Sequence, residues 1–189
     1  MVFRPSFLAA AAALFAVGAL AQDTCTPTFT SGTTYNVSMT ELPSFVWVNN
    51  GTIGSLGVNL RTTVPATPWY LSPTGFGGYV FSLDTEMSSC LYAYDNAHYP
   101  GVGGIYSSLG CYDATGELDL DEDFTFSCVE CYAGGGGYNC EITSSLSKQC
   151  VNTPDNELHY PSGEDELDQI KTATCSSTWY QRWDVNASS

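Results

Sequence analysis

Basic residues are scarce in this 189-residue chain, which has 5 Lys and Arg against 20 Asp and Glu and a formal net charge of −15. Binding to nucleic acid or to an anionic membrane surface requires Lys and Arg that contact phosphate groups. The charge balance therefore excludes both kinds of partner. It also argues against an anionic substrate, because the chain has few cationic side chains to hold one.

Long apolar runs are missing after the N-terminus. The apolar run Phe7 to Leu20 is shorter than the roughly 20 residues needed to cross a bilayer. It follows the basic residue Arg4 and ends at Ala19-Leu20-Ala21, which has the small-x-small form of a signal-peptidase site. We therefore predict a signal peptide over residues 1–21 and a single secreted domain over residues 22–189.

Recognisable catalytic signatures are missing as well. The chain has no G-x-S-x-G sequence of a serine hydrolase. Its two histidines, His98 and His159, lie in similar segments, residues 95–100 and 155–161, that both read Asp-Asn and then His-Tyr-Pro. We interpret these segments as turns whose similarity reflects turn chemistry rather than an acid–base pair. A polysaccharide hydrolase with paired carboxylates stays open, but no two of the 20 acids stand out.

Cysteine is present in an informative number. Eight cysteines in an exported chain indicate four disulfides and argue against a metal finger. The sequence does not decide among the possible pairings; we expect Cys131–Cys140 to brace the glycine-rich loop Gly134–Gly137 and Cys90–Cys111 to close a hairpin. The eight are Cys25, Cys90, Cys111, Cys128, Cys131, Cys140, Cys150 and Cys175. N-glycosylation sequons that agree with secretion begin at Asn36, Asn50 and Asn186.

Strand-forming and turn-forming residues dominate the rest of the chain, with Thr, Tyr, Val, Gly and Asn common. Many short strands separated by turns predict a mainly β, disulfide-stabilised β-sandwich or β-barrel. One segment, Glu164 to Thr172, begins with acids suited to a helix N-terminus and predicts one short C-terminal helix. The predicted strands are Thr33–Thr40, Ser44–Val48, Gly57–Thr62, Trp69–Leu71, Gly78–Asp84, Cys90–Tyr94, Ile105–Leu109, part of Leu118–Cys131, and Tyr138–Ser144.

The segment Asp119 to Glu130 allows two interpretations. Asp119, Asp121, Asp123 and Glu130 have the ligand spacing of a calcium-binding loop. The sixth place of such a loop needs a sharp turn that favours Gly, however, and Phe124 stands there. The same letters alternate between polar and apolar residues, so we favour a strand whose Asp side chains face water. In that strand Glu122 is the one residue that breaks the inward apolar row. No cofactor is expected, and calcium stays an alternative.

Aromatic residues form several local clusters, among them Tyr92 with Tyr94. Tyr and Trp suit stacking on sugar rings and protein interfaces, because an apolar ring face is combined with a polar edge. Trp179, Tyr180 and Trp183 lie close together near the C-terminus, beside Arg182. We predict that these three aromatic residues form an exposed ligand-binding patch.

The format of the chain resembles the small secreted cysteine-rich proteins of filamentous fungi, on its alanine-rich signal ending at Ala21, its cysteines and its sequons. Gly116-Glu117-Leu118, followed by Phe126-Ser127-Cys128 and Tyr138-Asn139-Cys140, resembles a terminal module of some fungal cell-wall proteins. The resemblance implies a secreted or wall-associated interaction protein and transfers no catalytic residues. We therefore predict a non-catalytic, effector-like binding protein that acts on polysaccharide or on an extracellular partner protein. A polysaccharide hydrolase and a calcium-dependent carbohydrate-binding module are the alternatives.

Overall fold

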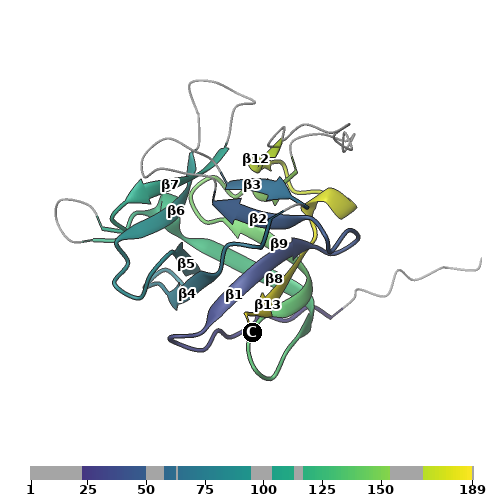
Figure 1. Cartoon of the computed structure of the whole chain (residues 1–189), viewed down its shortest axis with the longest axis horizontal. Helices are drawn as coiled ribbons and strands as arrows, with labels where there is room; N and C mark the ends of the chain where they lie inside the picture. Colours follow the sequence, from purple (N-terminus) through teal and green to yellow (C-terminus); the bar gives the residue numbers. More distant parts are fainter. Residues whose placement is uncertain are drawn as a thin grey trace, which may run out of the picture.

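The structure is a computed structural model, which describes residues 23–49, 58–62, 64–94, 104–112, 117–153 and 168–188. Regular structure in these ranges consists of strands and two 3₁₀ turns (Figure 1). No helix in them is long and apolar enough to cross a membrane. The strands and turns are β1 (Thr34–Met39), β2 (Val46–Asn49), β3 (Val58–Arg61), β4 (Trp69–Pro73), β5 (Tyr79–Ser82), β6 (Ser89–Tyr94), β7 (Gly104–Leu109), η1 (Leu120–Glu122), β8 (Phe124–Cys131), β9 (Gly137–Ser144), β10 (Cys150–Asn152), β11 (Asp168–Gln169), β12 (Lys171–Ala173), η2 (Trp179–Gln181) and β13 (Trp183–Ala187).

Six strands close into an antiparallel barrel. Around the ring, β1 pairs with β4, β4 with β5, β5 with β8, β8 with β9, β9 with β13, and β13 with β1 again. A closed ring removes the free edges that an open sheet exposes. The prediction of a mainly β fold is confirmed, and of its two forms the barrel is the one observed.

The other strands form hairpins between successive barrel strands. β2 pairs with β3, β6 with β7, and β10 with β12, and each hairpin comes between two strands of the barrel. β11 pairs with β3, and the amide of Ile105 in β7 donates to the carbonyl of Ile170, so the hairpins also contact one another (Figure 1). The chain thus repeats one four-strand unit three times, which is the β-trefoil arrangement.

The core lies inside the barrel and under the hairpins. Alternate residues of β1 and β13 point inward, as period-two alternation requires, so Val37, Trp183 and Val185 are fully buried. The Trp183 ring contacts that of Trp47 at 5.2 Å between centroids, and its Nε1–H donates to the Val151 carbonyl over 3.0 Å. Trp183 therefore joins the barrel to two of the hairpins, β2–β3 and β10–β12.

All eight cysteines form disulfides, as predicted, and Cys90–Cys111 has the expected pairing. The expected Cys131–Cys140 pair is wrong. Cys128 and Cys140 are register partners on β8 and β9 and bond to each other, because directly opposite residues bring their sulfurs together. Cys131 instead holds the N-terminal residue Cys25, and the fourth disulfide is Cys150–Cys175.

The predicted C-terminal helix is wrong in the part that the structure describes. Residues 168–169 and 171–173 form β11 and β12, while Glu164 to Leu167 lie outside the described residues. Ile170, expected on a helix face, is fully buried in the core between these strands. β12 pairs with β10, and the Cys150–Cys175 disulfide joins the ends of this pair, so tertiary pairing overrides the local helical pattern.

The two Asp-Asn/His-Tyr-Pro segments occupy equivalent places in the repeat. Residues 95–100 follow β6 in the second unit, and residues 155–161 follow β10 in the third. Both segments lie outside the described residues, so the equivalence concerns their position in the chain. The interpretation of both segments as turns stays a prediction.

A candidate ligand site on the β6–β7 hairpin

The β6–β7 hairpin has two chemically different faces. Leu91, Ala93 and Ile105 point into the core and are buried. The opposite face carries the register pairs Cys90 with Ser108 and Tyr92 with Tyr106, and then Tyr94 opposite Gly104. Because Gly104 has no side chain, the Tyr94 ring has no cross-strand neighbour of its own and is free to lean on Tyr106.

Three tyrosine rings lie together on this outer face. The rings of Tyr92 and Tyr106 stack with centroids 5.7 Å apart, and Tyr94 meets Tyr106 edge-on at 6.2 Å. Tyr94 is 47% exposed, and the other two are half-buried. Partly exposed rings that contact one another form a rigid surface for a ligand, since few side-chain rotations are lost on binding.

The 3₁₀ turn η1 brings two carboxyl groups to the same face. The pKa of the Tyr92 phenol is raised, mainly by burial and next by the neighbouring Tyr106. The charge of Asp121 is the third cause, so Asp121 lies near Tyr92. Burial also raises the pKa of Asp121 itself, with the charge of Asp119 adding to the effect. We call Tyr92, Tyr94, Tyr106, Asp121 and Glu122 the tyrosine–acid cluster.

Glu122 is the most unusual member of the cluster. Its side chain is buried, with 6% exposed, and Oε1 lies 3.2 Å from the Ser108 hydroxyl. Oε2 is buried without a hydrogen-bond partner. Burial raises the pKa of the Glu122 carboxyl to about 7, with smaller contributions from Asp121 and Asp119, while the Ser108 hydrogen bond opposes the shift. Strongly perturbed carboxyl groups of this kind are enriched at functional sites.

The predicted strand over Leu118–Cys131 is confirmed only from Phe124 onward. Before it the chain forms η1, so the inward and outward rows do not extend to residues 118–123. Asp119 is exposed as expected, but Asp123 is fully buried and Glu122 lies under the hairpin, so the prediction that Asp123 faces water is wrong. The physical reason is a turn, which breaks the period of two.

The four predicted calcium ligands are not gathered into one site. Asp119, Asp121 and Asp123 lie in or beside η1, whereas Glu130 is exposed near the other end of β8. The Asp123 carboxyl accepts hydrogen bonds from the hydroxyls of Thr74 and Ser145 instead. These two bonds tie the β4–β5 turn and the β9–β10 turn to the start of β8.

We expect calcium to have no effect on stability, because the two Asp123 oxygens already accept hydrogen bonds from the hydroxyls of Thr74 and Ser145. The midpoint of thermal unfolding, measured with excess calcium and with a chelator, should be the same. A higher midpoint in calcium would show that these acids gather around the ion. The same midpoint measured with excess magnesium is the control for a general effect of divalent cations on a chain of charge −15.

The predicted aromatic patch is only partly present. Trp179 is 38% exposed and Tyr180 is half-buried, and their rings meet edge-on at 5.8 Å. Trp183 is wrong as a surface residue, because it belongs to the core described above. Two aromatic rings of the patch therefore remain near the surface, against three in the tyrosine–acid cluster.

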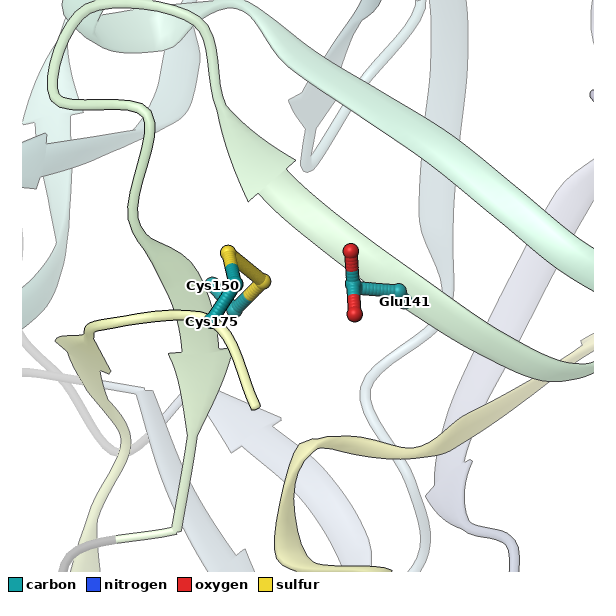
Figure 2. Close-up of side chains that lie close together, drawn as sticks. All are labelled: Glu141, Cys150 and Cys175. Atoms are coloured by element: carbon teal, nitrogen blue, oxygen red, sulfur yellow. A yellow bond between two sulfur atoms is a disulfide. The ribbon is translucent and has the colours of Figure 1, made fainter. Parts of the chain in front are cut away.

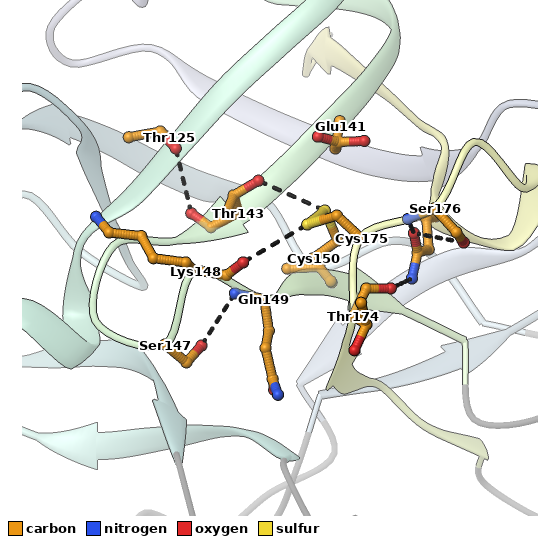
Figure 3. Close-up of a disulfide and its surroundings, with 12 residues drawn as sticks. Thr125, Glu141, Thr143, Ser147, Lys148, Gln149, Cys150, Thr174, Cys175 and Ser176 are labelled. Carbon is orange, nitrogen blue, oxygen red and sulfur yellow. Dashed lines mark hydrogen bonds between the residues drawn. A yellow bond between two sulfur atoms is a disulfide. The ribbon is translucent and has the colours of Figure 1, made fainter.

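A second group of potential ligands surrounds the Cys150–Cys175 disulfide. Glu141 faces the two sulfur atoms, and these are the only three metal-ligand side chains that lie within 4.8 Å of one another in the described part of the chain (Figure 2). Both sulfurs are used by the disulfide, and Glu141 forms an ion pair with Arg182 at 3.2 Å. Thr143 lies 3.6 Å from Cys150 Sγ and the Lys148 carbonyl 3.7 Å from Cys175 Sγ (Figure 3). The group is a structural brace rather than a metal centre.

Two of the three predicted glycosylation residues lie on one strand pair. Asn36 on β1 and Asn186 on β13 are register partners, and the Ser188 hydroxyl donates to Asn36 Oδ1 over 3.1 Å. Asn186 is exposed and Asn36 half-buried. Asn50 lies outside the described residues. Glycosylation stays a prediction at all three.

Comparison with known proteins gives the fold and not a family. No protein-family model and no curated protein matches the chain. Among solved structures, an exo-β-1,3-galactanase from Clostridium thermocellum has a TM-score of 0.58 at 16% identity, with 85% of this chain and 31% of that chain covered. A designed threefold-symmetric protein, ThreeFoil, has a TM-score of 0.51 at 11% identity, with 81% and 97% covered.

A third similar structure is the Saccharomyces cerevisiae protein O-mannosyltransferase Pmt1–Pmt2 complex bound to its sugar donor. Its TM-score is 0.56 at 6% identity, with 86% of this chain and 26% of that chain covered. This chain thus spans about a third of the galactanase and about a quarter of the transferase. The match covers 97% of the threefold-symmetric design, which agrees with the three repeated units.

Sequence reasoning missed the two residues at the centre of the site. Tyr106 lies 12 residues from Tyr94, so it does not belong to a local aromatic cluster in the sequence. Only the hairpin register places the two residues together. Glu122 was visible as the single break in the apolar row of the predicted strand. That break was a usable signal, since a buried acid without a cationic partner is rare.

Proposed function

We propose that the protein is a secreted, non-catalytic binding protein that recognises polysaccharide through the tyrosine–acid cluster. The observation that carries the proposal is the joint presence of braced tyrosine rings and carboxyl groups on one face of the β6–β7 hairpin. The C–H faces of a sugar ring pack on aromatic rings, and its hydroxyls donate to carboxyl oxygens. Tyr94 and Tyr106 supply the first kind of contact and Asp121 the second.

The wider properties of the chain support this proposal. Four disulfides are typical of proteins in oxidising, extracellular compartments. A charge of −15 leaves neutral polysaccharide acceptable as a partner, whereas it repels nucleic acid and anionic membranes. Similarity of fold to a galactanase and to a mannosyltransferase complex is in keeping with a carbohydrate-related role. The site of action is then a cell wall or an extracellular glycan.

Hydrolysis of the polysaccharide is the second candidate function. Burial raises the pKa of Glu122 to about 7, as a general acid in a glycosidase requires, and Asp121, the preceding residue of the same turn, would be the second carboxylate. The burial of Glu122 counts against this role, since a general acid has to reach the glycosidic oxygen. Binding therefore ranks first.

The test uses the purified protein with insoluble chitin, β-glucan, cellulose, mannan and galactan. The bound fraction and the released reducing sugar are measured in the same tubes. Binding without release supports the proposal. Release that is lost in Glu122→Gln would establish the hydrolase, and neither binding nor release on any polymer would refute both and leave an extracellular protein as the ligand.

A further inference from the structure

This inference rests on the proposed function and concerns how the same site is controlled. We propose that Glu122 is a positioning residue: while it carries a proton it holds η1 against the β6–β7 hairpin and keeps Asp121 beside Tyr92, so the tyrosine–acid cluster binds its ligand in acid and releases it when Glu122 ionises.

The Ser108 hydroxyl can donate to Glu122, which lowers the pKa of that carboxyl, or to a backbone carbonyl, in which case a protonated Glu122 can donate to Ser108. The Ser108 hydroxyl lies 2.9 Å from the Gly110 carbonyl, 3.2 Å from Glu122 Oε1 and 3.4 Å from the Cys90 carbonyl. A hydroxyl has one proton to donate, and the nearest acceptor is Gly110. A proton on Glu122 lets Oε1–H donate to Ser108 while Ser108 donates to Gly110, so both close contacts become hydrogen bonds.

When Glu122 is ionised, the single Ser108 proton cannot form both of these hydrogen bonds. If Ser108 turns its proton to Glu122, the contact with the Gly110 carbonyl loses its hydrogen bond. Oε2 stays buried without a partner, now as part of a charge, which costs far more than a neutral oxygen. The result is a buried charge held by one shared hydroxyl.

The groups that face Glu122 add to this cost. On its own turn the charges of Asp121 and Asp119 both disfavour ionisation. On the hairpin it contacts the Ser108 hydroxyl, and Tyr92, whose pKa burial raises above its usual value of 10, lies near Asp121 of the same turn. β5 also contacts η1, but its one titratable side chain, Tyr79, packs on Phe29 and Phe126 and donates to the Pro27 carbonyl. None of these groups supplies a positive charge.

The direction of the pH effect follows from the raised pKa. In the unfolded chain Glu122 loses its proton near pH 4.5, the ordinary pKa of Glu. In the folded chain it keeps the proton up to about pH 7. The stabilisation is complete below 4.5 and is lost as pH rises through 7. Ionisation places three neighbouring negative charges on the segment 119–122, which favours release of η1 from the hairpin.

The first test measures polysaccharide binding by the wild-type chain and by Glu122→Gln from pH 5 to pH 8. Gln keeps the size of Glu, is always neutral and has an N–H to donate to Ser108. If only the protonated form binds, wild-type affinity falls about tenfold between pH 5 and pH 8, in proportion to the protonated fraction. Glu122→Gln should bind equally at both pH values. Glu86→Gln, which changes an exposed acid in another turn, should follow the wild type.

A ligand-free measurement separates failure of the inference from failure of the proposed function. Hydrogen exchange of the Glu122 and Asp123 amides, which donate to the Asp119 and Leu120 carbonyls, reports whether η1 is docked. At pH 8 these amides should exchange several-fold faster in the wild type than in Glu122→Gln, and at pH 5 equally. If the wild type and Glu122→Gln exchange at the same rate at pH 8 as well as at pH 5, the inference is overturned, whether or not any polysaccharide binds.

A wild-type titration covers the case in which the variant does not fold. The carboxyl carbon resonance of Glu122 and the ring resonances of Tyr92 should shift together near pH 7. A midpoint near 4.5 for Glu122, or a Tyr92 ring that does not respond, would overturn the inference. Binding that stays constant from pH 5 to pH 8 in the wild type would do the same and leave the proposed function standing.

Discussion

Replacing Asp123 with Ala is expected to lower the free energy of unfolding by about 3 kcal/mol. The carboxyl group is fully buried and accepts hydrogen bonds from Thr74 and Ser145. Each such bond contributes roughly 1.5–3 kcal/mol, and part of this loss is recovered when water binds the two hydroxyls that Ala leaves without an acceptor. For a domain of this size the loss corresponds to a fall of about 10 °C in the unfolding midpoint. The measurement is thermal and denaturant unfolding with the disulfides intact.

The position of Asp123 explains why the effect should be large. Its backbone carbonyl accepts from the Ser145 amide, while Thr74 also accepts from the Gly78 amide, so one residue joins three connections of the chain. Gly78 is packed against Asp123: a Cβ there would collide with Asp123 Oδ1 and would lie 2.6 Å from the Phe124 carbonyl oxygen. Gly78→Ala should therefore also lower the free energy of unfolding, because its Cβ would push the Asp123 carboxyl out of place.

Glu86→Ala is the matched control for this stability measurement, because Glu86 is an exposed acid and removal of its side chain should leave the fold unchanged. Its effect should stay within about 0.5 kcal/mol of zero. If Asp123→Ala is no more destabilising than Glu86→Ala, the two hydroxyl bonds do not hold the turns together. The connection between the three loops would then have to come from backbone pairing alone.

Tyr106→Ala is expected to weaken polysaccharide binding at least tenfold while the protein stays folded. Tyr106 is the central ring of the cluster, stacked on Tyr92 and in edge contact with Tyr94, so its removal takes away the support of both neighbours. A tenfold loss corresponds to about 1.4 kcal/mol, within the range of an aromatic anchor at a binding surface. Binding isotherms on the polymer that the wild type prefers provide the measurement.

Tyr138→Ala is the matched control for binding. Tyr138 is 40% exposed on β9, outside the tyrosine–acid cluster, and its replacement removes an exposed tyrosine of the same size. We expect it to bind as the wild type does. Equal loss in both variants would mean that binding depends on exposed tyrosines in general rather than on this cluster.

Strand positions could be read from the sequence wherever a strand was bounded by turn residues. Nine predicted strands correspond to β1–β9, because alternation and Gly-, Pro- or Asn-containing turns frame each of them. β10 to β13 were missed. They are short, and Trp183 and Val185 look like part of a polar tail until β1 is known to lie beside them. Closure of the barrel depends on that non-local pairing, which no local pattern contains.

The candidate site could be predicted only in fragments. Tyr92 and Tyr94 were evident as an aromatic pair, but the site also needs Tyr106 from the facing strand and Asp121 with Glu122 from a turn. The segment 119–123 was misread because alternating letters fit a strand as well as a 3₁₀ turn followed by a strand. Which of the two forms is decided by the hairpin that covers Glu122, and this is a tertiary effect.

The most direct test of the account is an NMR titration of the wild-type protein with a soluble oligosaccharide of the polymer that it binds. At pH 5 the account predicts that the largest shift changes fall on the rings of Tyr92, Tyr94 and Tyr106 and on the amides of η1. Tyr138 and Trp179, both exposed elsewhere, should change little. Changes centred on Trp179 and Tyr180, with the β6–β7 hairpin unaffected, would contradict the account.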